Sequence, residues 1–315
     1  MSAYHKLNDR VRELVKDRFK DFEQEVIHGK TQAERSVEYQ KKREKHRREI
    51  LASVGTDLKK LDAAMESEGR MQEAELKRFL EEFRPKALNR RPTAASDAAD
   101  AAIHSAVLAE SGHKVLPVFA SSIFTPDRNA IDGDLDWNNG AINSGWVFPD
   151  DPSKIRIKDN YHDLSLCWPN RWGPPPEFAV HFTFVPATTA TYELVAVLAF
   201  HGFYLLVADD GYFSCRFAQV KLTAQMNVHQ YVNAGWKSFP PLLDLKKEHA
   251  QEVTNFDRTF FFDYTAALRA GDPVVITVKG VVEAFSHGGY THAELNFYDG
   301  TANYIQPLFL SVQQV

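Results

Sequence analysis

The stretch PVVITVKGVVEAF, residues 273 to 285, is rich in valine and sets Thr277, Lys279 and Glu283 at odd-numbered positions among apolar residues. A period of two residues with β-branched side chains predicts a strand that has one face in a core. Seven further stretches after His113 have a similar composition: residues 115–124, 154–159, 177–185, 191–200, 258–264, 291–299 and 304–312. No amphipathic helix separates these stretches, so the sequence predicts an all-β antiparallel sandwich, jelly-roll-like, with two packed sheets.

The front of the chain has the opposite character. From Ala3 to Arg84 there is no proline and little glycine, while the strong helix formers Glu, Lys, Arg, Ala and Leu abound. We therefore expect an α+β protein whose helices and strands occupy separate regions. Two sets of apolar residues with heptad-like spacing predict a coiled coil or a helical hairpin: Val15, Phe19, Phe22 and Val26, then Leu51, Val54, Leu58, Leu61 and Met65. Neither stripe can be buried within one helix, so we expect self-association through these helices.

Three regions follow from this division. Residues 1–84 form the helical region, residues 85–114 a linker with a short helix, and residues 115–315 the sandwich. Pro85 and Pro92 mark the end of the helices, because proline disrupts a helix interior. Gly55 and Thr56 predict a break within the helices. A hairpin, a small bundle and one kinked rod all fit this pattern.

The net charge of −5 conceals two unlike halves. Through Arg91 there are 23 Lys and Arg against 18 Asp and Glu, or +5, which leaves 14 against 24, or −10, for the remainder. An acidic domain disfavours nucleic acid as a ligand, because phosphate binding needs concentrated positive charge.

The chain is expected to be soluble. Its longest apolar run, residues 194 to 207, contains His201 and Gly202 and is too short to span a membrane. The first 30 residues contain no apolar signal core, which favours a cytoplasmic protein or one exported without a classical signal peptide. Cys167 and Cys215 lie in strand-like segments and are expected to be free thiols.

The stretch IDGDLDWNNG, residues 131 to 140, holds Asp132, Asp134 and Asp136 at alternate positions. It is not an EF-hand, because Trp137 occupies the glycine position and Asn143 stands where a bidentate glutamate is needed. The preferred interpretation is a solvated turn without a cofactor. A calcium ion held by these aspartates is one alternative, and a catalytic carboxylate is another.

Aromatic residues suggest a ligand-binding surface on the predicted sandwich. The proline-stiffened loop WPNRWGPPPEF contains Trp168, Asn170, Arg171 and Trp172, and Trp137 lies in a second loop. Flat apolar rings beside hydrogen-bonding groups suit a sugar ring or a protein surface. The alternative is that these rings pack over the open end of the sandwich.

His292 and Glu294 lie two residues apart, on one face of a predicted strand, with His287 shortly before them. Two histidines and a carboxylate would suit zinc or iron, but one strand alone is a weak basis for a metal site. We therefore predict a polar pair on the surface of the strand.

The sequence favours a non-enzymatic assembly or recognition protein. It would combine a helical oligomerisation stalk with a sandwich head that binds a glycan or a protein surface. The sequence contains neither a GxSxG nucleophile elbow nor a glycine loop for phosphates. The alternatives are a hydrolase that acts on a polysaccharide, with the helices as a targeting appendage, and a pore-forming or injected toxin whose helices rearrange.

Overall fold

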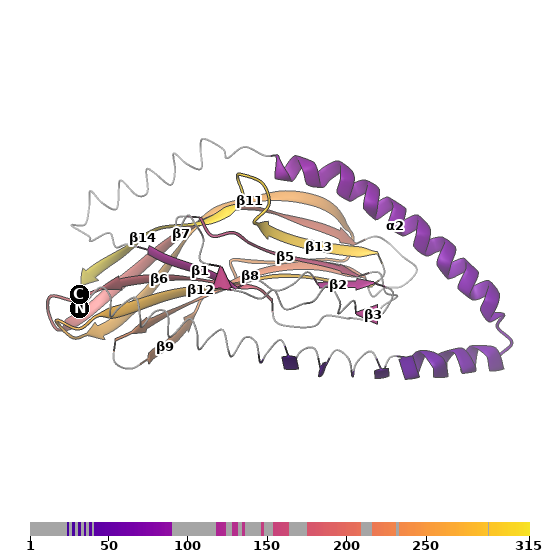
Figure 1. Cartoon of the computed structure of the whole chain (residues 1–315), viewed down its shortest axis with the longest axis horizontal. Coiled ribbons are helices and arrows are strands. Elements are labelled where there is room, and N and C mark those ends of the chain that lie inside the picture. The colour runs from indigo at the N-terminus through magenta and orange to yellow at the C-terminus, as the bar shows by residue number, and fades with distance from the viewer. Residues whose placement is uncertain are drawn as a thin grey trace.

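The computed structural model describes residues 41–89, 154–163, 175–208, 216–230, 233–288 and 290–315. It also describes isolated helical positions before residue 41 and the backbone of short strands between residues 118 and 147. Two mostly antiparallel sheets lie face to face, and the long helix α2 (Leu58–Leu88) runs along one of them (Figure 1).

The two sheets are called A and B. In the described part of the chain, the order in sheet A is β10 (Leu243–Lys247), β8 (Phe217–His229), β12 (Val274–His287), β6 (Glu177–Phe184), β1 (Val118–Ile123) and β4 (Trp146–Val147), and β9 (Asn233–Ser238) also pairs with β8. In sheet B the order is β11 (Ala250–Leu268), β7 (Ala190–Ala208), β13 (Thr291–Phe297), β5 (Ile157–Asp163), β2 (Arg128–Ile131) and β3 (Asp134–Leu135), and β14 (Tyr304–Gln314) also pairs with β7.

The long strands pair in a nested order. Strand β5 pairs with β13, β6 with β12, β7 with β11, and β8 with β10, each antiparallel. This is one long hairpin ribbon rolled so that successive pairs fall in alternate sheets, which is a jelly-roll-like arrangement. The predicted antiparallel sandwich is confirmed, and each of the eight predicted stretches overlaps a strand.

Strand β7 is longer than predicted, because His201 and Gly202 do not end it. A Cβ atom at Gly202 would collide with the Phe297 ring and the Asn296 carbonyl of β13, so glycine permits this close approach. Strands β13 and β14 share the same edge of β7, with β13 along residues 203–207 and β14 along residues 192–201.

The main core lies between the two sheets. Its largest fully buried side chains include Phe178 and Phe182 from sheet A and Phe200, Phe262 and Phe297 from sheet B. Burial alternates along β12 and β8, as expected for strands whose other face points away from the core.

The second predicted apolar stripe does not lie on one continuous helix. The described helical segment over residues 41–53 is followed by a turn at Val54 and Gly55. Helix α2 begins after its N-cap residue Asp57. Gly55 has a φ of 83°, and the amide of Thr56 donates to the Leu51 carbonyl at 3.0 Å, as in a Schellman C-cap. The prediction of one helix face from Leu51 to Met65 is therefore wrong, and the break predicted at Gly55 is confirmed. The stripe from Val15 to Val26 lies outside the described residues.

Helix α2 also continues past its predicted end. It passes through Pro85 and ends at Leu88, four residues beyond the helix end expected at Arg84. A proline lacks the amide donor, but only three helical residues follow it, and the amide of Asn89 still donates to the Pro85 carbonyl at 3.0 Å. Ala87 is buried against the sandwich, which favours the additional turn. No helix among the described residues is long and apolar enough to span a membrane.

Helix α2 packs on the outer face of sheet B. Leu76, Phe79 and Ala87 form a second buried cluster with three consecutive outward-facing residues of β7: Phe203, Leu205 and Val207. At its other end the docked half of α2 meets Tyr290, whose ring lies against Gly69. The covered face belongs to residues that a free-standing sandwich would expose to water.

Gly69 tests this docking. Glycine in a helix interior normally costs about 1 kcal/mol relative to alanine, so Gly69→Ala would stabilise an undocked helix. Because the new Cβ would collide with the Tyr290 ring, we instead expect a loss of about 1–3 kcal/mol in the free energy of unfolding. Urea unfolding followed by circular dichroism measures it, with the exposed Ser67→Ala as the control. A more stable Gly69→Ala would contradict the docked position.

Candidate functional site

The structure does not describe the side chains of the predicted sites. Trp137, Trp168, Asn170, Arg171 and Trp172 lie outside the described residues, as do Asp132 and Asp136. Asp134 begins β3, for which only the backbone is described. The ligand-binding loop and the calcium alternative therefore remain predictions. Among the described residues, a buried polar cluster lies where Arg84 of α2 meets Glu294 of β13.

An ion pair joins α2 to sheet B. The Nε atom of Arg84 donates to Oε2 of Glu294 at 3.1 Å, and Nη2 donates to Oε1 at 3.2 Å. The same Nη2 donates to Oδ2 of Asp299 at 3.2 Å. The Glu294 side chain is only 1% exposed, whereas that of Arg84 is 34% exposed. A two-point pair of this kind fixes both the position and the rotation of α2 on the sheet.

A network of polar side chains surrounds this pair. Asn296 donates from Nδ2 to Glu294 at 2.6 Å and to Asp299 at 2.8 Å, and Lys158 donates to Asp299 at 3.0 Å. The Oδ1 atom of Asn296 accepts from the amides of Tyr298 and Asp299, both at 2.8 Å. The turn after β13 is therefore held in the shape that presents Asp299 to Arg84.

Two histidines lie beside Glu294 on the same face. His292 and His162 are directly paired across β13 and β5, with ring centroids 5.8 Å apart. His292 is 7% exposed, and among the described residues neither of its ring nitrogens has a hydrogen-bond partner. The Nδ1 atom of His162 is likewise buried without a partner. The prediction that His292 and Glu294 form a surface pair is wrong, because their exposed fractions are only 7% and 1%.

The metal alternative for these histidines also changes. His287 lies on β12 of sheet A, where its ring contacts Phe217 at 5.6 Å between centroids, so it does not join His292. Within the described residues no three His, Cys, Asp or Glu side chains are grouped so that they could hold a metal ion.

The electrostatics of Glu294 are those of a permanently charged structural group. Burial raises the pKa of Glu294, but His292 and the Arg84 guanidinium outweigh it and hold the pKa at about 2. Of these two partners, Arg84 makes both hydrogen bonds, whereas Nε2 of His292 is 3.6 Å from the carboxylate, too far for one. Glu294 is therefore ionised and occupied, which does not suit a general acid.

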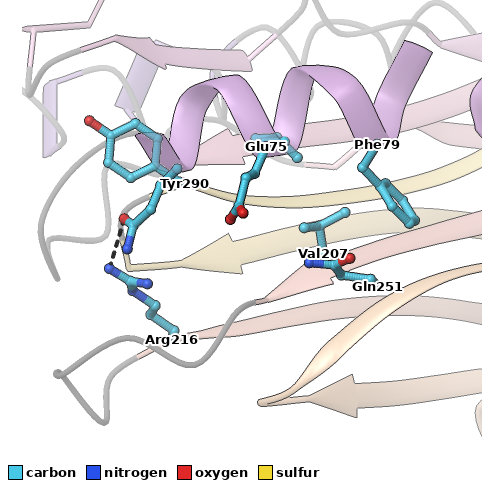
Figure 2. Close-up of a pocket in the computed structure, with 8 residues that line it drawn as sticks. Glu75, Phe79, Val207, Arg216, Gln251 and Tyr290 are labelled. Carbon is cyan, nitrogen blue, oxygen red and sulfur yellow. Dashed lines mark hydrogen bonds between the residues drawn. The ribbon is translucent and has the colours of Figure 1, made fainter. Parts of the chain in front are cut away.

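The other end of the helix interface is closed. Arg216 is 5% exposed and donates from Nη2 to Oε1 of Gln72 at 3.1 Å, shown by the dashed line in Figure 2. Beside this bond Glu75, Phe79 and Tyr290 line a crevice of about 10 Å³. That volume holds about one water molecule, so the interface between α2 and the sheet is a packed contact rather than a ligand pocket.

Comparison with known proteins gives no family. No family model and no curated protein matches the chain. Solved structures with some likeness include the carbohydrate-binding module TmCBM61 in complex with β-1,4-galactotriose, with 8% identity, 50% of this chain and 69% of the other chain covered, and a TM-score of 0.17. The A domain of epithelial adhesin 9 from Candida glabrata, in complex with Galb1-4GlcNAc, has 8% identity, 64% and 95% coverage, and a TM-score of 0.20. A pentameric capsid protein from metagenomic phage sequences has 15% identity, 49% and 67% coverage, and a TM-score of 0.14. Likeness at these scores supports no conclusion.

Substitution of Arg84 tests how strongly the stability of the fold depends on a partner for the buried Glu294 carboxylate. We expect Arg84→Met to lower the free energy of unfolding by about 3–5 kcal/mol, because Glu294 would be left charged and unpaired. The double variant Arg84→Met/Glu294→Met should recover most of that loss. Arg70→Met is the matched control, since it breaks an exposed pair with Glu66 and should change stability by about 0.5 kcal/mol or less. Equal losses from Arg84→Met and Arg70→Met in urea titrations would contradict the structural role of the pair.

The buried histidines predict a loss of stability in mild acid. Burial and the nearby His292 lower the pKa of His162 to about 4, and burial lowers the pKa of His181 to about 4. An unfolded histidine binds a proton below pH about 6.5. Protons therefore favour the unfolded chain between pH 6.5 and 4, and each histidine should cost up to about 3 kcal/mol over that range.

Urea titrations between pH 7 and 4.5 measure this effect. The slope of unfolding free energy against pH should decrease in His162→Gln and in His181→Gln. His46→Gln, at an exposed position of the helical segment, is the control and should keep the wild-type slope. Identical slopes in all four proteins would show that neither buried histidine is linked to stability.

Proposed function

We propose that this chain is a non-enzymatic assembly or recognition protein, in which a jelly-roll-like head carries a fixed helical element for self-association. The single observation behind this proposal is the division of the α2 apolar stripe. Leu76, Phe79 and Ala87 are buried on the head. The same helix face continues on the N-terminal side of Gly69, where the helix meets Tyr290. The apolar residues of that part are Leu58, Leu61 and Met65.

This second part is partly open to solvent, since Leu58 and Leu61 are half-buried and Met65 is exposed. Met65 is 38% exposed, and on the preceding helical segment Ile50 and Val54 are 50% and 73% exposed. Figure 1 shows this end of α2 and the turn before it extending past the strands. Exposed apolar residues on a projecting element favour association with another surface.

The head is proposed to bind a glycan or a protein surface. Support comes from the predicted loop with Trp168, Asn170, Arg171 and Trp172, from Trp137, and from Trp236 on β9. Trp236 is 45% exposed and lies 5.4 Å from the Lys279 ammonium group. An exposed indole beside a hydrogen-bonding cation suits recognition of a polar partner with an apolar face. Calcium bound by Asp132, Asp134 and Asp136 would be an accessory to this role.

Sedimentation velocity tests the assembly role. We expect the full chain to associate at micromolar concentration, and Ile50→Glu/Met65→Glu to sediment as a monomer with an unchanged melting temperature. Met71→Glu is the control, because Met71 is 62% exposed but lies about 120° around the helix from Met65. A monomeric wild-type chain would rule out self-association, and the helices would then belong to the head alone.

A further inference from the structure

The two helical arms that meet at Gly55 carry opposite charge. The basic arm, residues 41–48, has six Lys and Arg and one Glu. The acidic arm, residues 62–75 of α2, has five Asp and Glu and one Arg. These charged side chains are largely exposed, so they are not held together in buried ion pairs.

Among the described residues, a bridge between the arms lies near the turn that joins them. Arg48 donates from Nη1 and Nη2 to the Asp62 carboxylate at 2.8 and 2.7 Å. Away from this bridge the described helical segment and α2 diverge (Figure 1). Some charges pair within their own arm, as Arg47 does with Glu44 and Arg70 with Glu66, but the basic arm keeps a net charge of +5 (six minus one) and the acidic arm one of −4 (one minus five).

Apolar and charged residues share a face on the basic arm. Arg43, Arg47, Ile50 and Val54 follow a spacing of 4, 3 and 4 residues, which places them along one side of a helix. On the acidic arm Glu66 and Glu73 are seven residues apart and also share one side. Each arm thus combines exposed apolar groups with a net charge of one sign.

We propose that the occupant of this surface is a second copy of the same chain, with the basic arm of each copy lying along the acidic arm of the other. A two-fold axis fits this arrangement. The basic arm of the first copy then meets the acidic arm of the second, and the same contact is made again between the other two arms. The apolar residues near Gly55 would form the centre of the contact and the charges its rim. This inference rests on the self-association in the proposed function and specifies its geometry.

A second copy fits better than nucleic acid. Glu38 pairs with Lys42 at 2.8 Å, and Glu44 and Glu49 lie among the basic residues, so the basic arm is not a uniform phosphate-binding face. A copy of the chain supplies acidic and basic arms in equal number, and steering between them should weaken with salt.

Paired charge reversals test the proposal by sedimentation and by mixing. Arg43→Glu/Arg47→Glu and Glu66→Lys/Glu73→Lys should each weaken self-association by about tenfold or more. A one-to-one mixture of the two variants should associate as tightly as wild type, because each arm then meets its complement. Lys77→Glu/Arg78→Glu makes the same charge change as Arg43→Glu/Arg47→Glu on exposed residues of α2 outside the acidic arm, and should have no effect.

The outcomes separate this inference from the proposed function. Failure of the mixture to associate, or association of both reversed variants at wild-type strength, would overturn the crossed arrangement while self-association stands. A monomeric wild-type chain would overturn both. Melting curves show whether each variant retains the folded head.

Discussion

The buried carboxylate of Glu294 constrains the rest of the molecule. It lies on the outer face of sheet B at 1% exposure, and a charge in that position requires a partner. Arg84 supplies that partner from 210 residues earlier in the chain. The pair holds the C-terminal part of α2 beside β13, and apolar residues of the same helix pack on Phe203 and Leu205 of β7. A replacement by apolar residues of similar volume could be as stable, so the pair contributes specificity of position more than net free energy.

The covered face explains why the helices cannot be considered separately from the sandwich. Strand β7 directs Leu194, Leu198 and Phe200 into the core between the sheets and Phe203, Leu205 and Val207 toward α2. A strand that is apolar on both faces needs a layer on each side. Helix α2 is that additional layer, and the charge division near residue 91 consequently does not coincide with a boundary in packing.

Local sequence patterns predicted most of the fold and little of the site. Eight strands could be predicted because burial in a two-sheet sandwich imposes a period of two, and the break at Gly55 because a left-handed C-cap favours glycine. The same alternation was present in β8, where Val220, Leu222 and Met226 face the core, but its polar members obscured it. Contact between Arg84 and Glu294 leaves no local signal, because it depends on the fold. The spacing of His292 and Glu294 placed them on one face without showing that this face is buried.

A fixed helix changes what assembly requires. A flexible stalk would lose orientational freedom when two copies meet, and that entropy opposes association. Here the Arg84 pair, the Gln72 bond to Arg216 and the Gly69 contact with Tyr290 hold the docked half of α2 at both ends. The projecting half therefore leaves the head in one direction, and the Arg48 bridge to Asp62 joins the basic arm to it. Much of the entropy cost of orienting the helix is therefore incurred during folding and not during association. A few exposed apolar residues with complementary charges then suffice to join two copies.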